Sequence, residues 1–112
     1  MIEQELYINN YDWNLTVLYK ANQDLSVIAD ELLALLCPKK LAVEALRVMT
    51  HDNTGFCYTN DMLKSTLICI AEADSDEEFV NTVAHETRHL QSHVFSYYKI
   101  SEKGEEAAYF CW

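Results

Sequence analysis

The segment that follows Ser75 has the apolar spacing of one long helix, and this feature constrains the fold most strongly. Ser75 and Glu78 form the capping-box pattern of a helix start, with further acids in the first turn. Residues that can pack then recur at spacings of three and four, namely Val80, Val83, Thr87, Leu90 and Val94. The pattern predicts a helix from about residue 76 to about residue 98, with one face packed on the rest of the protein.

The first half of the chain alternates between strand and helix patterns. Residues 13–21 are rich in alternating β-branched and aromatic side chains and are predicted to form a strand. Residues 24–37 and 38–49 carry apolar residues at helical spacing and are predicted to form two helices. Pro38 separates them, because proline ends a helix that precedes it and is favoured as the first residue of the next.

Two short strand patterns and a final helix pattern complete the chain. Residues 55–59 and 65–71 are predicted strands, joined by a turn as a hairpin or meander. Residues 101–104 interrupt the long helix, and residues 105–112 are predicted to form a last short helix with acids at its start. The sequence thus predicts a single α+β domain over residues 1–112, with a small mixed or antiparallel sheet packed on helices.

The charge balance argues against several kinds of partner. The chain has 112 residues, with 18 acidic and 8 basic side chains and a formal net charge of −10. Such a surface repels nucleic-acid phosphates and anionic lipid, so we expect neither nucleic acid nor a membrane as a partner. The N-terminus carries acids where a signal peptide would carry basic residues, and no apolar run is long enough to span a bilayer. We therefore expect a cytoplasmic protein.

The cysteines fit the same compartment. Cys37, Cys57, Cys69 and Cys111 are scattered along the chain, and no two form a Cys-x-x-Cys pair. This spacing favours reduced thiols, buried as small hydrophobic residues, over a disulfide framework or a zinc knuckle.

The long predicted helix contains the pattern His-Glu-x-x-His, formed by His85, Glu86 and His89. Residues four apart on a helix project in the same direction, so both imidazoles can reach one ion, and the apolar stripe is centred away from them. A catalytic zinc site uses three protein ligands and leaves one position for water. Glu86 lies on the flank of the histidine face, where it can take a proton from that water without binding the metal. The pattern therefore predicts one catalytic zinc ion per chain.

A third zinc ligand has to come from elsewhere in the sequence. His93 is the nearest candidate, but a continuous helix places it about 12 Å along the axis from His85. We therefore expect His93 to lie at the surface or beside a ligand rather than to bind the metal.

Two glutamates after the long helix are better candidates for the third ligand. A turn at residues 101–104 would bring the last predicted helix back antiparallel, with Glu105 and Glu106 at its start. Glu105 shares a helical face with Ala108, whose small side chain would allow a close approach to the metal-bearing helix. Glu106 shares a face with bulkier residues, so Glu105 is favoured. Glu106 stays open as a ligand, as does the possibility that both acids only stabilise a helix start.

The sequences "VAHETRHL" and "GEEAAYF" together resemble the gluzincin branch of zinc metallopeptidases. In that branch, the two histidines of His-Glu-x-x-His and a glutamate of a downstream Glu-x-x-Ala helix bind zinc. The resemblance implies a zincin-like fold, with His85, His89 and Glu105 as zinc ligands and Glu86 as the catalytic base. In particular, the chain is similar to the small, single-domain minigluzincin-like peptidases of bacteria and phages, in the part from residue 65 onward.

The resemblance also implies a reaction and a way of holding the substrate. Zinc-activated water, deprotonated by Glu86, would attack a peptide carbonyl, and Glu86 would pass the proton to the leaving amine. In the resembled enzymes, the strand before the metal-bearing helix lies at the sheet edge and pairs with an extended peptide, and here that strand is residues 65–71. The expected function is therefore a zinc-dependent metallopeptidase that acts on peptides or proteins.

Other interpretations of the pattern stay open. The main alternative is a catalytically inactive zincin-like protein that binds or regulates a partner, because the domain is small for an enzyme with a substrate cleft. A third is purely structural, with His85 and His89 as ordinary surface residues and the aromatic residues near the C-terminus as a dimer contact. For the enzyme, a donor to the oxyanion is also needed. The candidates, none of them favoured, are His51, Tyr97, Tyr98 and Tyr109.

Overall fold

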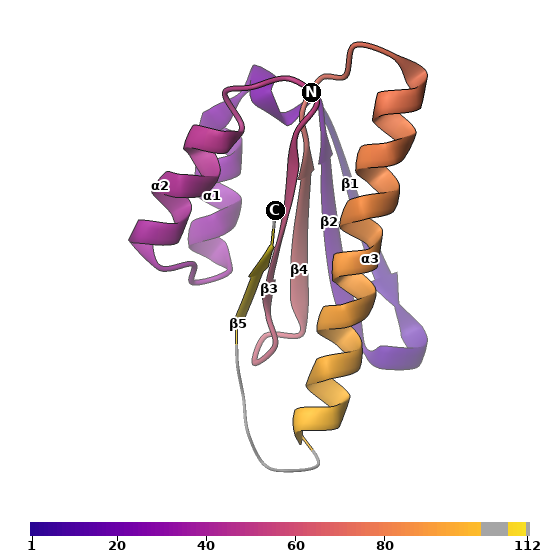
Figure 1. Cartoon of the computed structure of the whole chain (residues 1–112). Coiled ribbons are helices and arrows are strands. Elements are labelled where there is room, and N and C mark those ends of the chain that lie inside the picture. Colours follow the sequence, from indigo (N-terminus) through magenta and orange to yellow (C-terminus); the bar gives the residue numbers. More distant parts are fainter. Residues whose placement is uncertain (102–107, 112) are drawn as a thin grey trace.

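Five strands form one mixed sheet in the order β1-β2-β4-β3-β5 (Figure 1). In this computed structural model, residues 1–101 and 108–111 are described, with side chains through residue 97. The strands are β1 (Ile2–Ile8), β2 (Trp13–Tyr19), β3 (Gly55–Asn60), β4 (Ser65–Ile70) and β5 (Ala108–Cys111). β2 and β4 run parallel, and the other neighbouring strands pair antiparallel. The predicted α+β class with a small mixed sheet is confirmed.

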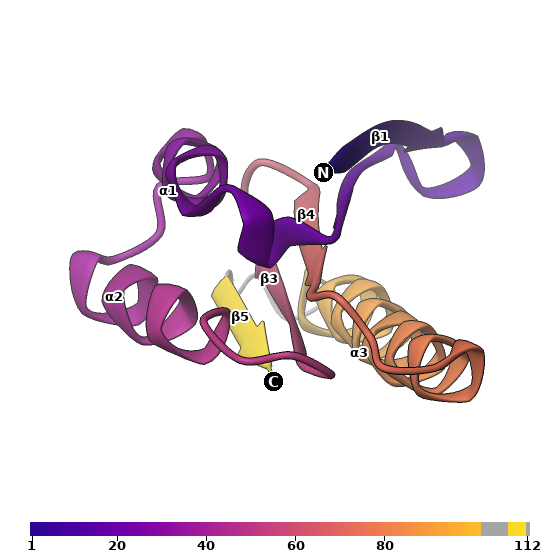
Figure 2. The same ribbon diagram turned by 90° about the horizontal axis from the view of Figure 1, so that it is seen from above.

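Helices cover both faces of the sheet. α1 (Leu25–Ala34) and α2 (Lys39–Val48) lie on one face, and α3 (Asp76–Ser101) lies on the other (Figure 2). Short 3-10 turns, η1 (Asn9–Tyr11) and η2 (Ala21–Gln23), lie before and after β2. Within the described residues, no helix combines the length and apolar character that crossing a membrane requires. The helices predicted over residues 24–37, 38–49 and about 76–98 are present as α1, α2 and α3.

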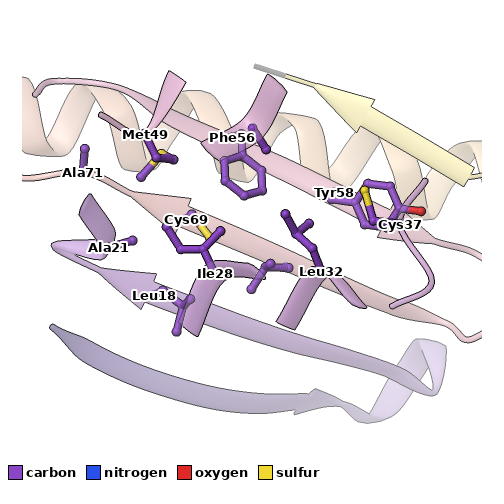
Figure 3. Packing of buried hydrophobic residues seen from close by; sticks show 12 residues of the cluster. Leu18, Ala21, Ile28, Leu32, Cys37, Met49, Phe56, Tyr58, Cys69 and Ala71 are labelled. Atoms are coloured by element: carbon purple, nitrogen blue, oxygen red, sulfur yellow. The ribbon is translucent and has the colours of Figure 1, made fainter. Parts of the chain in front are cut away.

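The sheet separates two hydrophobic cores, because successive residues of a strand point to opposite faces. The core on the side of α1 and α2 is shown in Figure 3 and includes the fully buried residues Leu18, Ile28, Leu32, Phe56 and Leu67. The core on the side of α3 includes Trp13, Leu15, Val17, Cys57, Ile68, Ile70, Leu90 and Val94. The second core fixes α3 on the sheet and so positions the side chains that α3 carries.

β4 is an interior strand. It pairs with β2 on one side and with β3 on the other, through the same residues Ser65–Ile70. The expectation that residues 65–71 form a sheet edge open to a substrate is therefore wrong. In the described part of the chain, the edge strands are β1 and β5.

The C-terminal segment forms a strand where a helix was predicted. Residues Ala108–Cys111 pair antiparallel with residues 57–60 of β3. The predicted helix over residues 105–112 is therefore wrong for residues 108–111. Glutamate and alanine favour helix locally, but the ladder with β3 satisfies the backbone groups of this segment, and tertiary pairing overrides propensity. β1 was not predicted at all.

α3 begins as predicted but packs on a different face. The Oγ of Ser75 accepts a hydrogen bond from the backbone N–H of Glu78 at 3.1 Å, which confirms the capping residue. Of the predicted stripe, Leu90 and Val94 are buried and Val83 is partly buried, whereas Val80 and Thr87 are exposed. The buried face instead includes two polar residues, Glu86 and His93. The helix is thus rotated so that its packed face borders the two histidines of the motif.

The cysteines fit the prediction where they are described. Cys37, Cys57 and Cys69 are buried and form no disulfide among the described residues. Burial raises the pKa of the Cys37 and Cys69 thiols, which keeps them protonated and unreactive. The side chain of Cys111 lies outside those described.

Candidate metal centre

His85, Glu86 and His89 lie together near the middle of α3. The Nε2 atoms of His85 and His89 are 3.0 Å apart, and their rings meet edge to face with centroids 4.5 Å apart. Oε1 of Glu86 lies 4.0 Å from Nε2 of His85. Ligand atoms of all three residues lie within 4.8 Å of one another, and the described residues contain one such group. The structure therefore brings together three of the four predicted site residues.

The two histidine nitrogens fit the ligand positions of one zinc ion. Tetrahedral zinc ligands at about 2.0–2.1 Å from the ion lie about 3.3 Å from each other. The observed separation of 3.0 Å between the Nε2 atoms is close to this, so a small rotation of either ring suffices. His85 is exposed and His89 is half-buried. An ion held between them would be reached from solvent, as a catalytic metal requires.

Glu86 is a buried carboxyl group. Its relative exposure is 1%, and its Oε2 has no hydrogen-bond partner among the described residues. Burial raises the pKa of Glu86 to about 7. A carboxyl group with a pKa near neutrality can accept and release a proton under the conditions of a cell. The environment of Glu86 thus suits the role of general base that the sequence predicts.

Gly55 explains how α3 comes so close to the sheet at this point. A Cβ at Gly55 would lie 2.9 Å from the carbonyl oxygen of Cys69, 3.0 Å from Cγ2 of Thr82 and 3.3 Å from Cγ of Glu86. Any side chain would therefore displace backbone or push α3 away. Because Gly55 has none, Glu86 lies directly against the start of β3.

A groove with a volume of about 410 Å³ opens beside the cluster. One wall is the segment between α2 and β3, and the other is the first half of α3. The lining residues are Val48, Asn53, Thr54, Gly55, Asn81, Thr82, His85 and Glu86. A substrate in this groove would therefore contact both a metal-ligand candidate and the proposed base.

Hydrogen bonds hold the groove wall in place. Asn53 has a left-handed backbone with φ 58°, and its Nδ2 donates to Oδ2 of Asp74 at 2.7 Å. The backbone N–H of Asp74 returns a bond to Oδ1 of Asn53 at 2.8 Å, and the backbone N–H of Asn53 donates to the carbonyl of Glu72 at 2.9 Å. These bonds join the segment before β3 to the segment before α3. They fix the position of Asn53 in the groove wall.

His93 is buried and lies beside the candidate ligand His89, which is one of the two positions expected for it. Its relative exposure is 3%, and its ring stacks beside that of His89 with centroids 6.3 Å apart. Its Nδ1 lies 2.8 Å from Oγ1 of Thr59, which lies 2.7 Å from Oγ1 of Thr66, and Thr66 accepts a bond from Nε1 of Trp13 at 2.9 Å.

The polarity of this chain follows from its first member. An indole N–H can only donate, so Thr66 accepts from Trp13 and its own hydroxyl proton is left for Thr59. The hydroxyl of Thr59 then donates to Nδ1 of His93. Burial lowers the pKa of His93 to about 4, and the neighbouring His89 adds to the effect. His93 is therefore a neutral residue that fastens α3 to the sheet, and its Nδ1 is engaged by Thr59.

The third predicted ligand lies outside the described residues, as does Glu106. Ala108, expected to share a helical face with Glu105, is instead in β5 and pairs with Asn60. Asn60 is at the opposite end of β3 from Gly55, which lies against Glu86. A close helix-to-helix approach through Ala108 is therefore wrong, while Glu105 as a ligand stays a prediction.

The structure places two of the candidate donors to the oxyanion outside the groove lining. Tyr97 packs edge-on against Trp13 with ring centroids 5.4 Å apart. His51 is exposed on the turn after α2, where its carbonyl accepts a bond from Oγ1 of Thr54 at 2.9 Å. The side chains of Tyr98 and Tyr109 are not among those described.

The burial of Glu86 and His93 was missed, although the sequence contains a signal for it. Val83, Glu86, Leu90, His93 and Tyr97 recur at alternating spacings of three and four, as regularly as the predicted stripe. Glu86 and His93 are polar, so the pattern was assigned to their apolar neighbours instead. The importance of Gly55 is visible only in three dimensions.

Comparisons with known proteins add no identification. No protein-family model matches the chain, and neither the curated proteins nor the solved structures contain a significant match.

Proposed function

We propose that this chain is a zinc-dependent hydrolase of peptide bonds with a zincin-like site, in which His85 and His89 bind the metal and Glu86 is the general base. The observation that carries the proposal is the buried carboxyl group of Glu86 beside the paired Nε2 atoms of two histidines. A buried acid whose Oε2 lacks a partner among the described residues is costly to fold. Such groups concentrate at functional sites.

The metal and Glu86 have different roles in the proposed reaction. Zinc held at this site supplies Lewis acidity, which polarises a carbonyl group and acidifies water. Glu86 takes a proton from a water molecule in the groove and returns it to the leaving amine. The packing of α3 on Gly55 fixes the Glu86 carboxylate, so little reorganisation is needed during the transfer.

The peptide lies in the groove between α3 and the segment before β3. β4 is paired on both sides and offers no free backbone groups to an extended substrate. The groove, in contrast, contacts both His85 and Glu86. Glu105 stays the predicted third ligand, with Glu106 as its alternative. Peptides or proteins in the cytoplasm stay the expected substrates.

Hydrolysis of a mixed library of quenched fluorescent peptides tests the proposal. The zinc-loaded protein is compared with Glu86→Gln and with Glu77→Gln, a control that removes an exposed acid from the first turn of the same helix. We expect Glu86→Gln to retain zinc and lose at least about a hundredfold in rate. Glu77→Gln should keep the rate of the unaltered protein. Equal rates for all three proteins would reject Glu86 as the base.

The same experiment separates the main alternative. A catalytically inactive zincin-like binding protein would bind zinc through His85 and His89 and hydrolyse none of the peptides. The Glu86→Gln variant of such a protein would bind a partner as well as the unaltered protein does.

A further inference from the structure

β1 presents an unusually open edge to solvent. It pairs with β2 over its whole length, from Ile2 opposite Tyr19 to Ile8 opposite Trp13, without a bulge. On its outer side, no described strand pairs with it. Proteins commonly protect such edges with charged side chains, proline or a bulge, and of these β1 has only the acids Glu3 and Glu5. In the described part of the chain, no strand lies beyond β1, and a further strand can be added at this side of the sheet.

The two faces of β1 differ in chemistry. On the side of α3, Ile2, Leu6 and Ile8 extend the apolar face of β2, interrupted by Gln4, and Ile2 and Leu6 are 60% and 45% exposed. This face continues into an apolar cavity of about 560 Å³. Ile8 lies in the cavity wall together with Leu90, Val94 and Phe95 of α3. An apolar side chain placed beside β1 would therefore find a preformed site.

The other face of β1 is acidic. Glu3 and Glu5 lie on the side of α1, where both approach Glu31. Burial, a hydrogen bond to Glu3 and the negative charges of Glu3, Glu5 and Asp30 raise the pKa of Glu31. The negative charges of Glu3, Glu5 and Asp30 thus act on Glu31 beside the open edge of β1, and cations on this face would relieve the repulsion.

We propose that β1 is a docking edge for an extended segment of a partner protein in which lysine or arginine alternates with apolar residues. Alternate side chains of an added strand point to opposite faces. The basic residues would lie over Glu3 and Glu5, and the apolar residues would lie over Leu6 and Ile8 and enter the cavity. This surface is separate from the candidate metal centre, so the inference does not depend on the proposed function.

A second copy of the chain fits this edge poorly. Each chain has a formal net charge of −10. Antiparallel pairing of two β1 strands would also bring the acids of both copies onto the same face of the joined sheet. The acidic residues thus disfavour pairing of two copies and favour a basic strand.

Binding of a labelled nine-residue peptide of alternating lysine and valine to the full chain tests the proposal by fluorescence anisotropy. The double variant Glu3→Lys/Glu5→Lys should weaken binding by about tenfold or more. The control Glu44→Lys/Glu77→Lys changes the net charge equally on α2 and α3 and should weaken binding by less than about twofold. Leu6→Ser should also weaken binding, and backbone amides of β1 should become protected from hydrogen exchange when the peptide is present.

Three results would overturn the proposal. Equal weakening by the two charge variants would show attraction by net charge alone. Equal binding of a peptide with glutamate in place of lysine would remove the charge complementarity. Sedimentation of the unaltered protein as a dimer, with β1 already protected from exchange, would assign the edge to a second copy of the chain.

Discussion

Glu86 and His85 are neighbours in sequence, and Oε1 of Glu86 lies 4.0 Å from Nε2 of His85, yet their environments are opposite. The side chain of His85 is 57% exposed, whereas that of Glu86 is 2% exposed. The boundary between solvent and core thus passes between a candidate metal ligand and the candidate base. An ion bound at the surface would therefore lie beside a carboxyl group that is shielded from bulk water.

Glu86→Gln should stabilise the metal-free protein in alkaline solution. The pKa of Glu86 is about 7 in the fold against an ordinary 4.5, so the folded state holds a proton that the unfolded chain releases. The free energy of unfolding therefore falls as the pH rises from about 4.5 to about 7. The free energy of unfolding of the variant minus that of the unaltered protein should be larger at about pH 8 than at about pH 4. The increase should be roughly 2 kcal/mol, after allowance for screening by solvent. Urea unfolding at both pH values measures this difference, and a constant difference would contradict the burial of a charged group.

His93 should make the fold sensitive to acid. Its pKa is lowered to about 4 from 6.5, so the unfolded state binds a proton that the folded state refuses. The free energy of unfolding should therefore fall as the pH drops from about 6.5 to about 4, by roughly 2 kcal/mol. Glu86 has the opposite slope in part of this range, so the effect of His93 is measured most clearly in the Glu86→Gln background. Adding His93→Gln should remove the slope, whereas adding His51→Gln, which alters an exposed histidine, should leave it.

Thr59→Val should destabilise the protein by about 1–3 kcal/mol, because it leaves Nδ1 of His93 and the hydroxyl of Thr66 without their shared partner in a buried site. Thr87→Val is the matched control, since Thr87 is exposed on α3 and its hydroxyl donates to the carbonyl of Val83 on the same helix. The control should change stability by less than about 0.5 kcal/mol. Chemical denaturation of both variants decides the matter, and equal effects would mean that the buried chain of hydrogen bonds contributes nothing.

Gly55→Ala should destabilise the fold by about 1–3 kcal/mol, because the added methyl group meets the backbone carbonyl of Cys69 at 2.9 Å and cannot be relieved by a side-chain rotation. The same substitution should displace Glu86, which lies 3.3 Å from the added atom. Thermal unfolding, together with a loss of the pH dependence attributed to Glu86, checks both effects. An alanine variant as stable as the unaltered protein would show that α3 is not held against β3 as closely as described.

Patterns of single elements could be predicted, whereas their pairing could not. The helices α1, α2 and α3 follow from apolar periodicity and from caps such as Ser75, all of which are local in sequence. β1 was missed because Glu3, Gln4 and Glu5 are poor strand formers, and its ladder with β2 supplies what its sequence lacks. β5 was predicted as a helix because two glutamates and two alanines favour one locally. Strand order, which places β4 in the interior, depends on contacts between distant residues that no local pattern contains.

The candidate site divides in the same way. His85 and His89 could be placed together, because their spacing on a helix is fixed by geometry. The burial of Glu86 could not be predicted, because it depends on how α3 is rotated on the sheet and on the missing side chain of Gly55. The third ligand was predicted on a helix that, at Ala108, the structure replaces with a strand.

Zinc binding to the chelator-treated protein, followed by titration calorimetry, tests the central claim most directly. The unaltered protein should bind one zinc ion per chain, and His85→Ala and His89→Ala should each weaken that binding by at least about a hundredfold, since each removes a ligand. His51→Ala, which removes a histidine from outside the group, should bind as the unaltered protein does. Absence of zinc binding by the unaltered protein, or binding that survives both His85→Ala and His89→Ala, would contradict the assignment of α3 as the metal-bearing helix.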